Sequence, residues 1–152
     1  MANQLPSWWF LKTGINAILV GILVVFSWNQ ALNTPAALAY IAQAVVVIGA
    51  VINLAHYRIL KRAAPHLGDP EELATCGGFL RWIRHPMYLG ELIFVFGLAL
   101  LIYSPLALIL TAVYLYAIIR LTAAEDQQMA ARFGHEHAAW SNKTHALLPG
   151  IW

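Results

Sequence analysis

The chain has 152 residues, of which 61% are hydrophobic and only 11% are charged, and its formal net charge is +2. A soluble domain usually carries about a quarter charged residues. These figures exclude a disordered chain, a nucleic-acid-binding module and an ordinary cytosolic globule, so we expect a membrane protein without nucleic-acid partners.

Four apolar stretches predict four transmembrane helices, since a helix needs about 20 apolar residues to cross a bilayer. They cover residues 10–30, 35–56, 86–103 and 105–122. Only Ser104-Pro105 separates the last two stretches, which predicts a tight helical hairpin there. The predicted fold is therefore an all-α, four-helix integral membrane protein. Its single domain spans residues 1–152, with a cytoplasmic loop at 57–85 and a cytoplasmic C-terminal helical cap in the tail, 123–152.

The basic residues give the orientation of these helices. With four crossings, all nine Lys and Arg residues fall on the side that holds both termini, the loop and the tail. The positive-inside rule then places both termini in the cytoplasm, and we expect a multi-pass protein of a bacterial-type inner membrane. The first stretch could be a cleaved signal peptide, but the nearest A-x-A pattern, Ala37-Leu38-Ala39, lies inside the second stretch. We interpret the first stretch as a retained helix.

The first chemistry-bearing segment is GFLRWIRHPMYLGE, residues 78–91. Pro86 fits the first turn of a helix, which leaves several backbone N–H groups without intrahelical partners. Arg84 and His85 lie at that positive helix end, a combination that suits a ligand bearing a carboxylate or several acceptor oxygens. The alternative is that the arginines only anchor the topology and that His85 and Tyr88 are interfacial residues.

The second segment spans Arg120 to Trp140 and contains Glu125. It is predicted to continue the fourth membrane helix into the cytoplasm and to end at Gly134. The tail is then expected to fold back over the loop and hide four apolar side chains. These are Phe133, Trp140, Leu147 and Leu148. A pocket between such elements would be apolar with a few polar groups, as cofactor sites usually are.

Together the two segments resemble the superfamily of isoprenylcysteine carboxyl methyltransferases and phospholipid N-methyltransferases. A G-x-x-R-x-[IV]-R-H-P-x-Y-x-G block covers Gly78–Gly90, and an E-[ED]-x-x-[LM]-x-x-x-F-G block covers Glu125–Gly134. The resemblance implies that S-adenosylmethionine is the cofactor and that it binds in the cytoplasmic pocket. His85, Pro86, Met87 and Tyr88 would contact the cofactor, and Glu125 would hold its polar end.

Four more positions complete the expected site. Leu73 and Thr75 would supply backbone contacts, by the same resemblance. Leu80 stands where the family often has an aromatic residue. Arg84 completes the cofactor-binding set, since the cofactor's carboxylate needs an arginine or helix N–H groups. No metal site is expected, because the tail histidines match no zinc spacing.

Two further polar residues are the catalytic candidates. Glu91 lies inside the third apolar stretch, where a carboxylate is a functional candidate or is paired structurally. Arg120 stands next to Leu121, a position that some members of the superfamily fill with a substrate-binding arginine. An amine or thiol acceptor would need a base, for which Glu91 or His85 is the candidate. Gly90 and Gly97 are expected to permit close helix packing.

The predicted function is S-adenosylmethionine-dependent methyl transfer to a lipophilic or membrane-associated acceptor. A prenylcysteine-like carboxylate, a phospholipid amine and a small thiol all stay open, and the sequence assigns no oligomeric state. The predicted partners are the lipid substrate and the bilayer. The alternatives are a nicotinamide-dependent membrane reductase and a small non-enzymatic membrane subunit.

Overall fold

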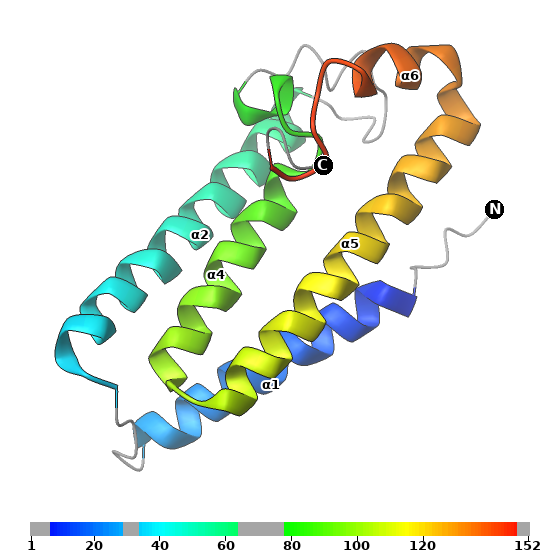
Figure 1. The fold of residues 1–152 in the computed structure, drawn as a ribbon. Helices are drawn as coiled ribbons and strands as arrows, with labels where there is room; N and C mark the ends of the chain where they lie inside the picture. Colours follow the sequence, from blue (N-terminus) through cyan, green and yellow to red (C-terminus); the bar gives the residue numbers. More distant parts are fainter. Residues whose placement is uncertain (1–6, 29–33, 64–77, 149–152) are drawn as a thin grey trace. The chain divides into compact units, whose positions relative to one another are not determined.

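The computed structural model describes residues 7–28, 34–63 and 78–148 (Figure 1). Within these ranges the chain forms five α-helices and a short 3-10 helix, with no strand beyond one isolated bridge. The elements are α1 (Ser7–Trp28), α2 (Ala36–Ala63), η1 (Gly78–Arg81), α4 (Pro86–Ile102), α5 (Pro105–Phe133) and α6 (His135–Ser141). The predicted all-α class is confirmed.

Two helix ends follow directly from local sequence signals. Tyr103 adopts a left-handed backbone conformation (φ 49°) after α4, and Pro105 begins α5, so the predicted hairpin at Ser104-Pro105 is confirmed. Gly134 is also left-handed (φ 49°) and lies between α5 and α6. Glycine adopts this conformation at no steric cost, so α5 can end there. The predicted end of this helix at Gly134 is confirmed.

One other boundary differs from the predicted one. α2 continues to Ala63 rather than ending at residue 56, because the sequence YRILKRA has neither glycine nor proline to end it. The predicted loop at 57–85 is therefore helical over its first seven residues. α5 runs on past residue 122 as one helix of 29 residues, as the second segment predicted.

Two helices in the described ranges are long and apolar enough to cross a membrane, not the four predicted. They cover Ala36–Arg62 and Pro105–Phe133, while Phe10–Val25 and Pro86–Ile102 are shorter apolar helices. The 17 residues of α4 extend about 26 Å, less than a hydrocarbon core of about 30 Å. Only 11% and 33% of the apolar windows in the two long helices are buried, so neither is the core helix of a soluble protein.

The chain divides into two compact units. Unit 1 comprises Met1–Ala50 and Glu91–Leu121, and unit 2 comprises Val51–Gly90 and Thr122–Trp152. α2, α4 and α5 each contribute residues to both units. The apolar helical stretches fall mainly in unit 1, and the two chemistry-bearing segments fall mainly in unit 2.

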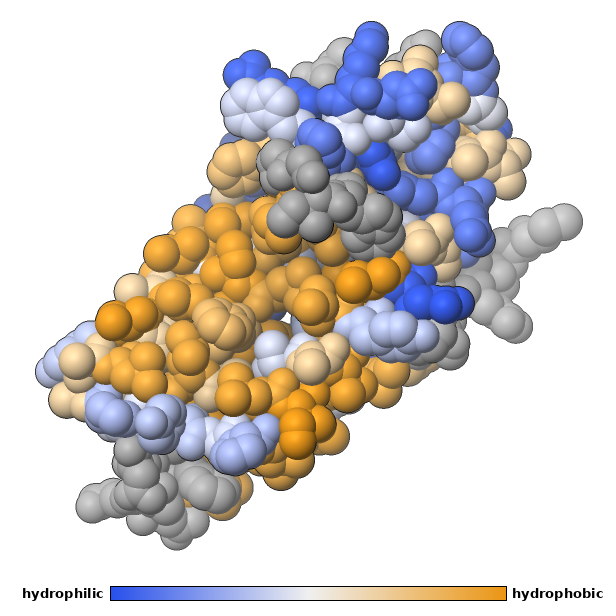
Figure 2. Space-filling model, viewed as in Figure 1, coloured by the Kyte–Doolittle hydropathy of each residue, from blue (hydrophilic) through white to orange (hydrophobic). Residues whose placement is uncertain are grey.

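Unit 1 presents a hydrophobic surface. Figure 2 shows hydrophobic side chains gathered over its helices on the visible face. Large apolar side chains are exposed on α2 and α5, among them Ile41, Val47, Leu108 and Ile109. An apolar surface of this kind is stable against lipid rather than water. The surface of unit 1 therefore agrees with a membrane protein.

Inside unit 1, α2 and α4 approach closely at Gly97. A Cβ atom at this position would lie 2.7 Å from Val46 Cγ2 and 2.8 Å from the Val46 backbone nitrogen. Backbone atoms cannot give way as a flexible side chain can. The expectation that Gly97 permits close helix packing is confirmed.

The contact at Gly97 gives a stability prediction. Gly97→Ala should destabilise the protein by about 1–3 kcal/mol, because the two helices must separate to admit the methyl group. Gly21→Ala in α1 is the matched control, since a Cβ there would have no heavy atom within 4 Å. Thermal unfolding in detergent compares the two variants. An unchanged midpoint for Gly97→Ala, or an equal fall for Gly21→Ala, would contradict the assigned contact.

Candidate functional site

The first chemistry-bearing segment pairs with the tail through its backbone. Ile83 forms a parallel bridge with His145. The Arg84 N–H donates to the His145 carbonyl at 2.7 Å, and the His85 N–H donates to the Ala146 carbonyl at 3.1 Å. Ile83 and Ala146 are buried. The tail thus folds back over the end of the loop, as expected.

The four apolar tail residues are not all hidden. Trp140 and Leu147 are buried, Phe133 is half-buried, and Leu148 is exposed, so the expectation is wrong for Leu148. Trp140 packs with Leu60 of α2 and Met129 of α5. This small apolar cluster fixes α6 against two other elements of unit 2.

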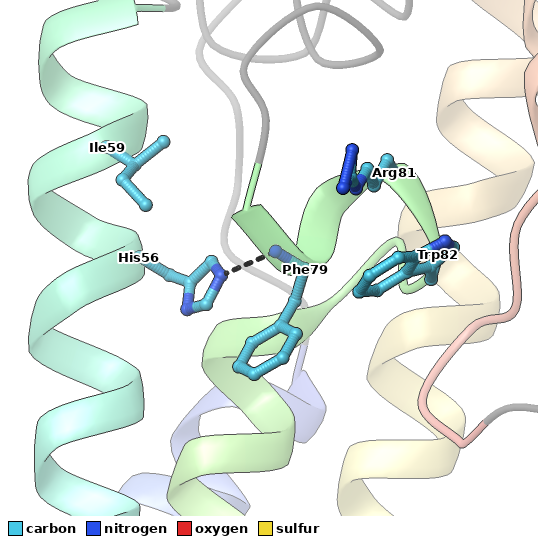
Figure 3. Close-up of a pocket in the computed structure, with 5 residues that line it drawn as sticks. All are labelled: His56, Ile59, Phe79, Arg81 and Trp82. Carbon is cyan, nitrogen blue, oxygen red and sulfur yellow. Dashed lines mark hydrogen bonds between the residues drawn. The ribbon is translucent and has the colours of Figure 1, made fainter.

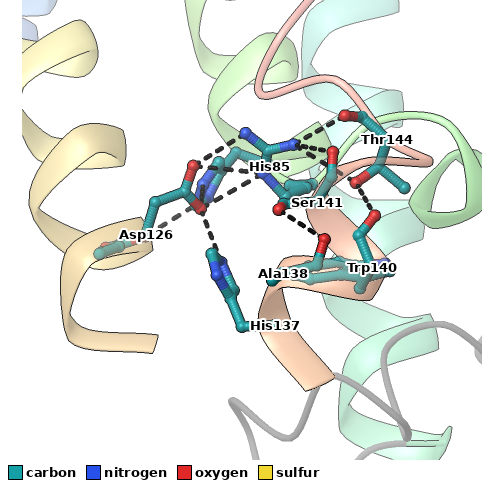
Figure 4. A network of polar contacts seen from close by, with 9 residues as sticks. His85, Asp126, His137, Ala138, Trp140, Ser141 and Thr144 are labelled. Carbon is teal, nitrogen blue, oxygen red and sulfur yellow. Dashed lines mark hydrogen bonds and ion pairs between the residues drawn. The ribbon is translucent and has the colours of Figure 1, made fainter. Parts of the chain in front are cut away.

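Arg84 joins α5 to the tail. Figure 4 shows the surrounding polar network, with Asp126 on one side and Ser141 and Thr144 on the other. Its Nε and Nη2 atoms donate to both carboxylate oxygens of Asp126, with Nη2 to Oδ2 at 2.9 Å. Its Nη1 atom donates to the Ser141 carbonyl at 3.2 Å and to the Thr144 carbonyl at 2.7 Å. A guanidinium that binds a carboxylate through two nitrogens fixes its geometry as well as its charge. Arg84 therefore holds three elements of unit 2 in one arrangement.

His85 lies between two carboxylates. Its Nε2 atom is 3.1 Å from Asp126 Oδ1, and its Nδ1 atom is 3.5 Å from Glu125 Oε2. Burial alone would lower the pKa of the imidazole, but its hydrogen bonds to Asp126 and Glu125, together with their charges, outweigh burial. The pKa of His85 is therefore raised above its usual 6.5. The protonated imidazolium can donate to both carboxylates at once.

The raised pKa of His85 predicts a pH dependence of stability. The protonated His85 stabilises the fold through Asp126 and Glu125. This stabilisation is complete below the unfolded-state pKa of 6.5 and is lost as the pH rises through the higher folded-state pKa. The thermal midpoint should therefore fall as the pH is raised above 6.5, and the fall should be smaller in His85→Gln. Equal slopes in the two proteins would rule out this contribution.

Glu125 and Tyr88 form the contact that joins the two sequence blocks. The Tyr88 hydroxyl donates to Glu125 Oε1 at 2.5 Å, and the Tyr88 ring stacks on the His85 ring with centroids 5.8 Å apart. The Glu125 side chain is 34% exposed. Its carboxylate is thus oriented by the start of α4 and stays accessible to a ligand.

The other predicted cofactor-binding residues have different surroundings. Pro86 is fully buried, and the Met87 carbonyl accepts a hydrogen bond from Asn53 Nδ2 at 3.1 Å. Leu80 lies in η1, and its side chain is outside the part that the structure describes. Leu73 and Thr75 lie outside the described residues. Their contacts with a cofactor stay predictions.

The two catalytic candidates belong to unit 1. Glu91 Oε2 accepts hydrogen bonds from Lys12 Nζ at 2.6 Å and from the Tyr114 hydroxyl at 2.8 Å. Lys12 and Tyr114 are both buried. Arg120 is exposed on α5. Glu91 is thus paired with a lysine of α1, and the catalytic roles of Glu91 and Arg120 stay predictions.

Three residues of the network were not among the predicted site residues. Asp126 binds Arg84 and His85, Thr144 accepts from Arg84, and His137 Nε2 lies 3.7 Å from Asp126 Oδ1. The second acidic position of the E-[ED] block could have indicated Asp126. His137 and Thr144 carry no comparable signal, because only the folded tail brings them to α5.

The comparison with known families settles which proteins this chain is related to. The sequence model described as phospholipid methyltransferase matches residues 37–136, more than half of the chain. The chain belongs to the phospholipid methyltransferase family. The match covers both sequence blocks, so the predicted resemblance is confirmed. No curated protein and no solved structure matched in the corresponding comparisons.

Membership of the phospholipid methyltransferase family supports methyltransferase activity on a lipid-like substrate. Together with two helices long and apolar enough to cross a bilayer, it also supports association with a membrane. In this member of the family, the polar contacts of unit 2 bring the two sequence blocks into one network.

Proposed function

We propose that this protein transfers a methyl group from S-adenosylmethionine to a lipophilic or membrane-associated acceptor. The Tyr88–Glu125 contact beside His85 carries the proposal, since it joins residues of the two blocks that share the family resemblance. The acceptor is a phospholipid amine, a prenylcysteine-like carboxylate or a small thiol. Family membership favours the lipid-like acceptors.

The residues of unit 2 fit a ligand with the charges of S-adenosylmethionine. The amino group and the sulfonium of the cofactor are cationic and need a carboxylate, which Glu125 offers in a partly exposed position. Two buried nitrogens, His137 Nε2 and Trp140 Nε1, form no hydrogen bond within the described part of the chain. A buried polar atom of this kind needs a partner, and a polar ligand or a water molecule would supply one.

Tyr88, His85 and Glu125 have different roles in the proposed reaction. S-adenosylmethionine, when bound, supplies an electrophilic methyl group that reacts by in-line displacement. Tyr88 orients the Glu125 carboxylate, and His85 holds it from the other oxygen. An imidazolium held between two carboxylates is a poor base, so His85 contributes charge and orientation rather than proton abstraction. Alignment of the acceptor with the methyl group supplies most of the acceleration.

The membrane orientation is part of the proposal. Unit 2 contains Arg58, Lys61, Arg62, Arg81, Arg84, Arg132 and Lys143. By the positive-inside rule, these residues favour a cytoplasmic position for unit 2, where S-adenosylmethionine is available. The acceptor would then reach the site from the bilayer and the cofactor from the cytosol.

Calorimetric titration of the detergent-solubilised protein with S-adenosylhomocysteine and with NADPH tests the cofactor. We expect saturable binding of S-adenosylhomocysteine and none of NADPH. Binding of NADPH alone would favour a reductase, and binding of neither would favour a non-enzymatic subunit. Mass spectrometry of membrane lipids and small thiols, with and without the protein, would then identify the acceptor by the gain of one methyl group.

A further inference from the structure

Unit 2 also contains a pocket of about 370 Å³ between the end of α2 and the η1 segment (Figure 3). Its lining residues are His56, Ile59, Phe79, Arg81 and Trp82. None of them belongs to the Glu125–His85–Asp126 network. The pocket is therefore a candidate binding site that the proposed cofactor contacts do not use.

The His56 ring carries no charge in this arrangement. Its Nδ1 atom lies 3.0 Å from the Ile52 carbonyl, to which only an N–H can donate. Its Nε2 atom lies 3.3 Å from the Phe79 backbone N–H, from which only a lone pair can accept. Both contacts together require the neutral imidazole with its proton on Nδ1. His56 also stacks on the Phe79 ring, with centroids 5.1 Å apart.

Among the described lining residues, Arg81 is then the charged one. Its guanidinium stacks over the Trp82 ring at 4.6 Å from the ring centroid. Within the described ranges it forms no hydrogen bond or ion pair with a protein group. A stacked guanidinium keeps the N–H groups at its planar edge available, and two of them match the spacing of two phosphate oxygens. The pocket thus offers one positive group beside apolar walls.

We propose that this pocket binds the phosphate group of a phospholipid through Arg81. A phospholipid joins an anionic phosphate to apolar chains, which matches the Arg81 cation beside Ile59 and the aromatic rings in the described part of the lining. Phe79 and Trp82 are 42% and 53% exposed, and aromatic residues of this kind favour the headgroup region of a bilayer. The inference rests on the proposed function, because it makes the pocket the recognition site for a phospholipid acceptor.

Native mass spectrometry of lipid binding tests the role of Arg81. The probes are phosphatidylethanolamine, diacylglycerol with the same acyl chains, and glycerophosphoethanolamine. Arg81→Gln should weaken phosphatidylethanolamine binding at least about tenfold, the lower end of the effect of one charge-assisted hydrogen bond. Arg81→Lys should retain part of the affinity, since lysine keeps the charge and loses the bidentate geometry. Diacylglycerol binding should not change, and glycerophosphoethanolamine should bind far more weakly than the lipid.

Arg132→Gln is the matched control variant, because Arg132 also stacks on an aromatic ring, at 4.9 Å from the Phe133 centroid, and does not line the pocket. It should bind phosphatidylethanolamine as the wild type does. Equal lipid affinity in Arg81→Gln and wild type would overturn the inference. So would an equal loss in Arg132→Gln, which would indicate a nonspecific charge effect.

The same variants are titrated with S-adenosylhomocysteine to separate this inference from the proposed function. Unchanged S-adenosylhomocysteine affinity in Arg81→Gln supports a lipid site distinct from the cofactor site. A parallel loss of both ligands would overturn the inference, because the pocket would then serve the cofactor. Arg81-dependent lipid binding in a wild-type protein that binds no S-adenosylhomocysteine would support the inference and contradict the proposed function.

Discussion

Glu125→Gln should weaken S-adenosylhomocysteine binding by between about tenfold and a hundredfold. The amide can still accept the Tyr88 hydrogen bond, so the variant removes the negative charge and keeps the shape of the side chain. Hydrogen bonds to charged groups contribute about 1.5–3 kcal/mol, which corresponds to this range of affinity. Calorimetric titration of both proteins measures the change.

Glu136→Gln is the control for this substitution. Glu136 is an exposed carboxylate in the first turn of α6, in the same unit, so its loss changes the net charge equally. The control should bind S-adenosylhomocysteine as the wild type does. Wild-type affinity in Glu125→Gln would remove Glu125 from the cofactor site, and a far-ultraviolet spectrum would show whether the helices are retained.

Lys12→Met should destabilise unit 1 by up to about 3–5 kcal/mol, because it leaves the half-buried Glu91 carboxylate without its counter-charge. The Tyr114 hydroxyl still donates to Glu91, but one neutral donor does not replace the ammonium. For a chain of this length, such a loss should lower the midpoint of thermal unfolding by on the order of 10 °C. A thermal scan in detergent measures it.

The double variant Lys12→Met/Glu91→Gln tests whether Glu91 is structural or catalytic. Removing both charges eliminates the uncompensated ion, so most of the lost stability should return. Methyl transfer by this double variant would indicate that Glu91 serves the ion pair. A stable double variant without activity would support the predicted catalytic role. A midpoint as low as that of Lys12→Met alone would contradict the ion-pair explanation.

The sequence predicted those helix ends that depend only on residues adjacent in the chain. Proline and glycine at fixed positions predicted the hairpin at Ser104-Pro105 and the end of α5 at Gly134, because both act through backbone conformation. Helix α2 continues seven residues beyond the predicted transmembrane stretch 35–56, because residues 57–63 contain neither glycine nor proline. Polarity marks where a helix can leave the bilayer, and only the backbone decides where it ends.

Side-chain partners could not be predicted in the same way. Lys12 and Glu91 are 79 residues apart in the chain, and Arg84 and Asp126 are 42 apart. A periodic pattern shows which face a residue occupies and not which residue faces it across a helix pair. The sequence therefore indicated which segments carry charge, and the structure was needed to show that Arg84 holds Asp126 and the tail.

The two carbonyl acceptors of Arg84 are synthesised long after Arg84 itself, which affects the order of assembly. Ser141 and Thr144 follow Arg84 by 57 and 60 residues. At a translation rate of about 5–20 residues per second, the ribosome adds them roughly 3–12 seconds after Arg84. We therefore expect insertion of the apolar helices to begin before the Ser141 and Thr144 carbonyls can accept hydrogen bonds from Arg84. A chain that ends before residue 141 would contain the α4 and α5 sequences and still lack both carbonyl acceptors of Arg84.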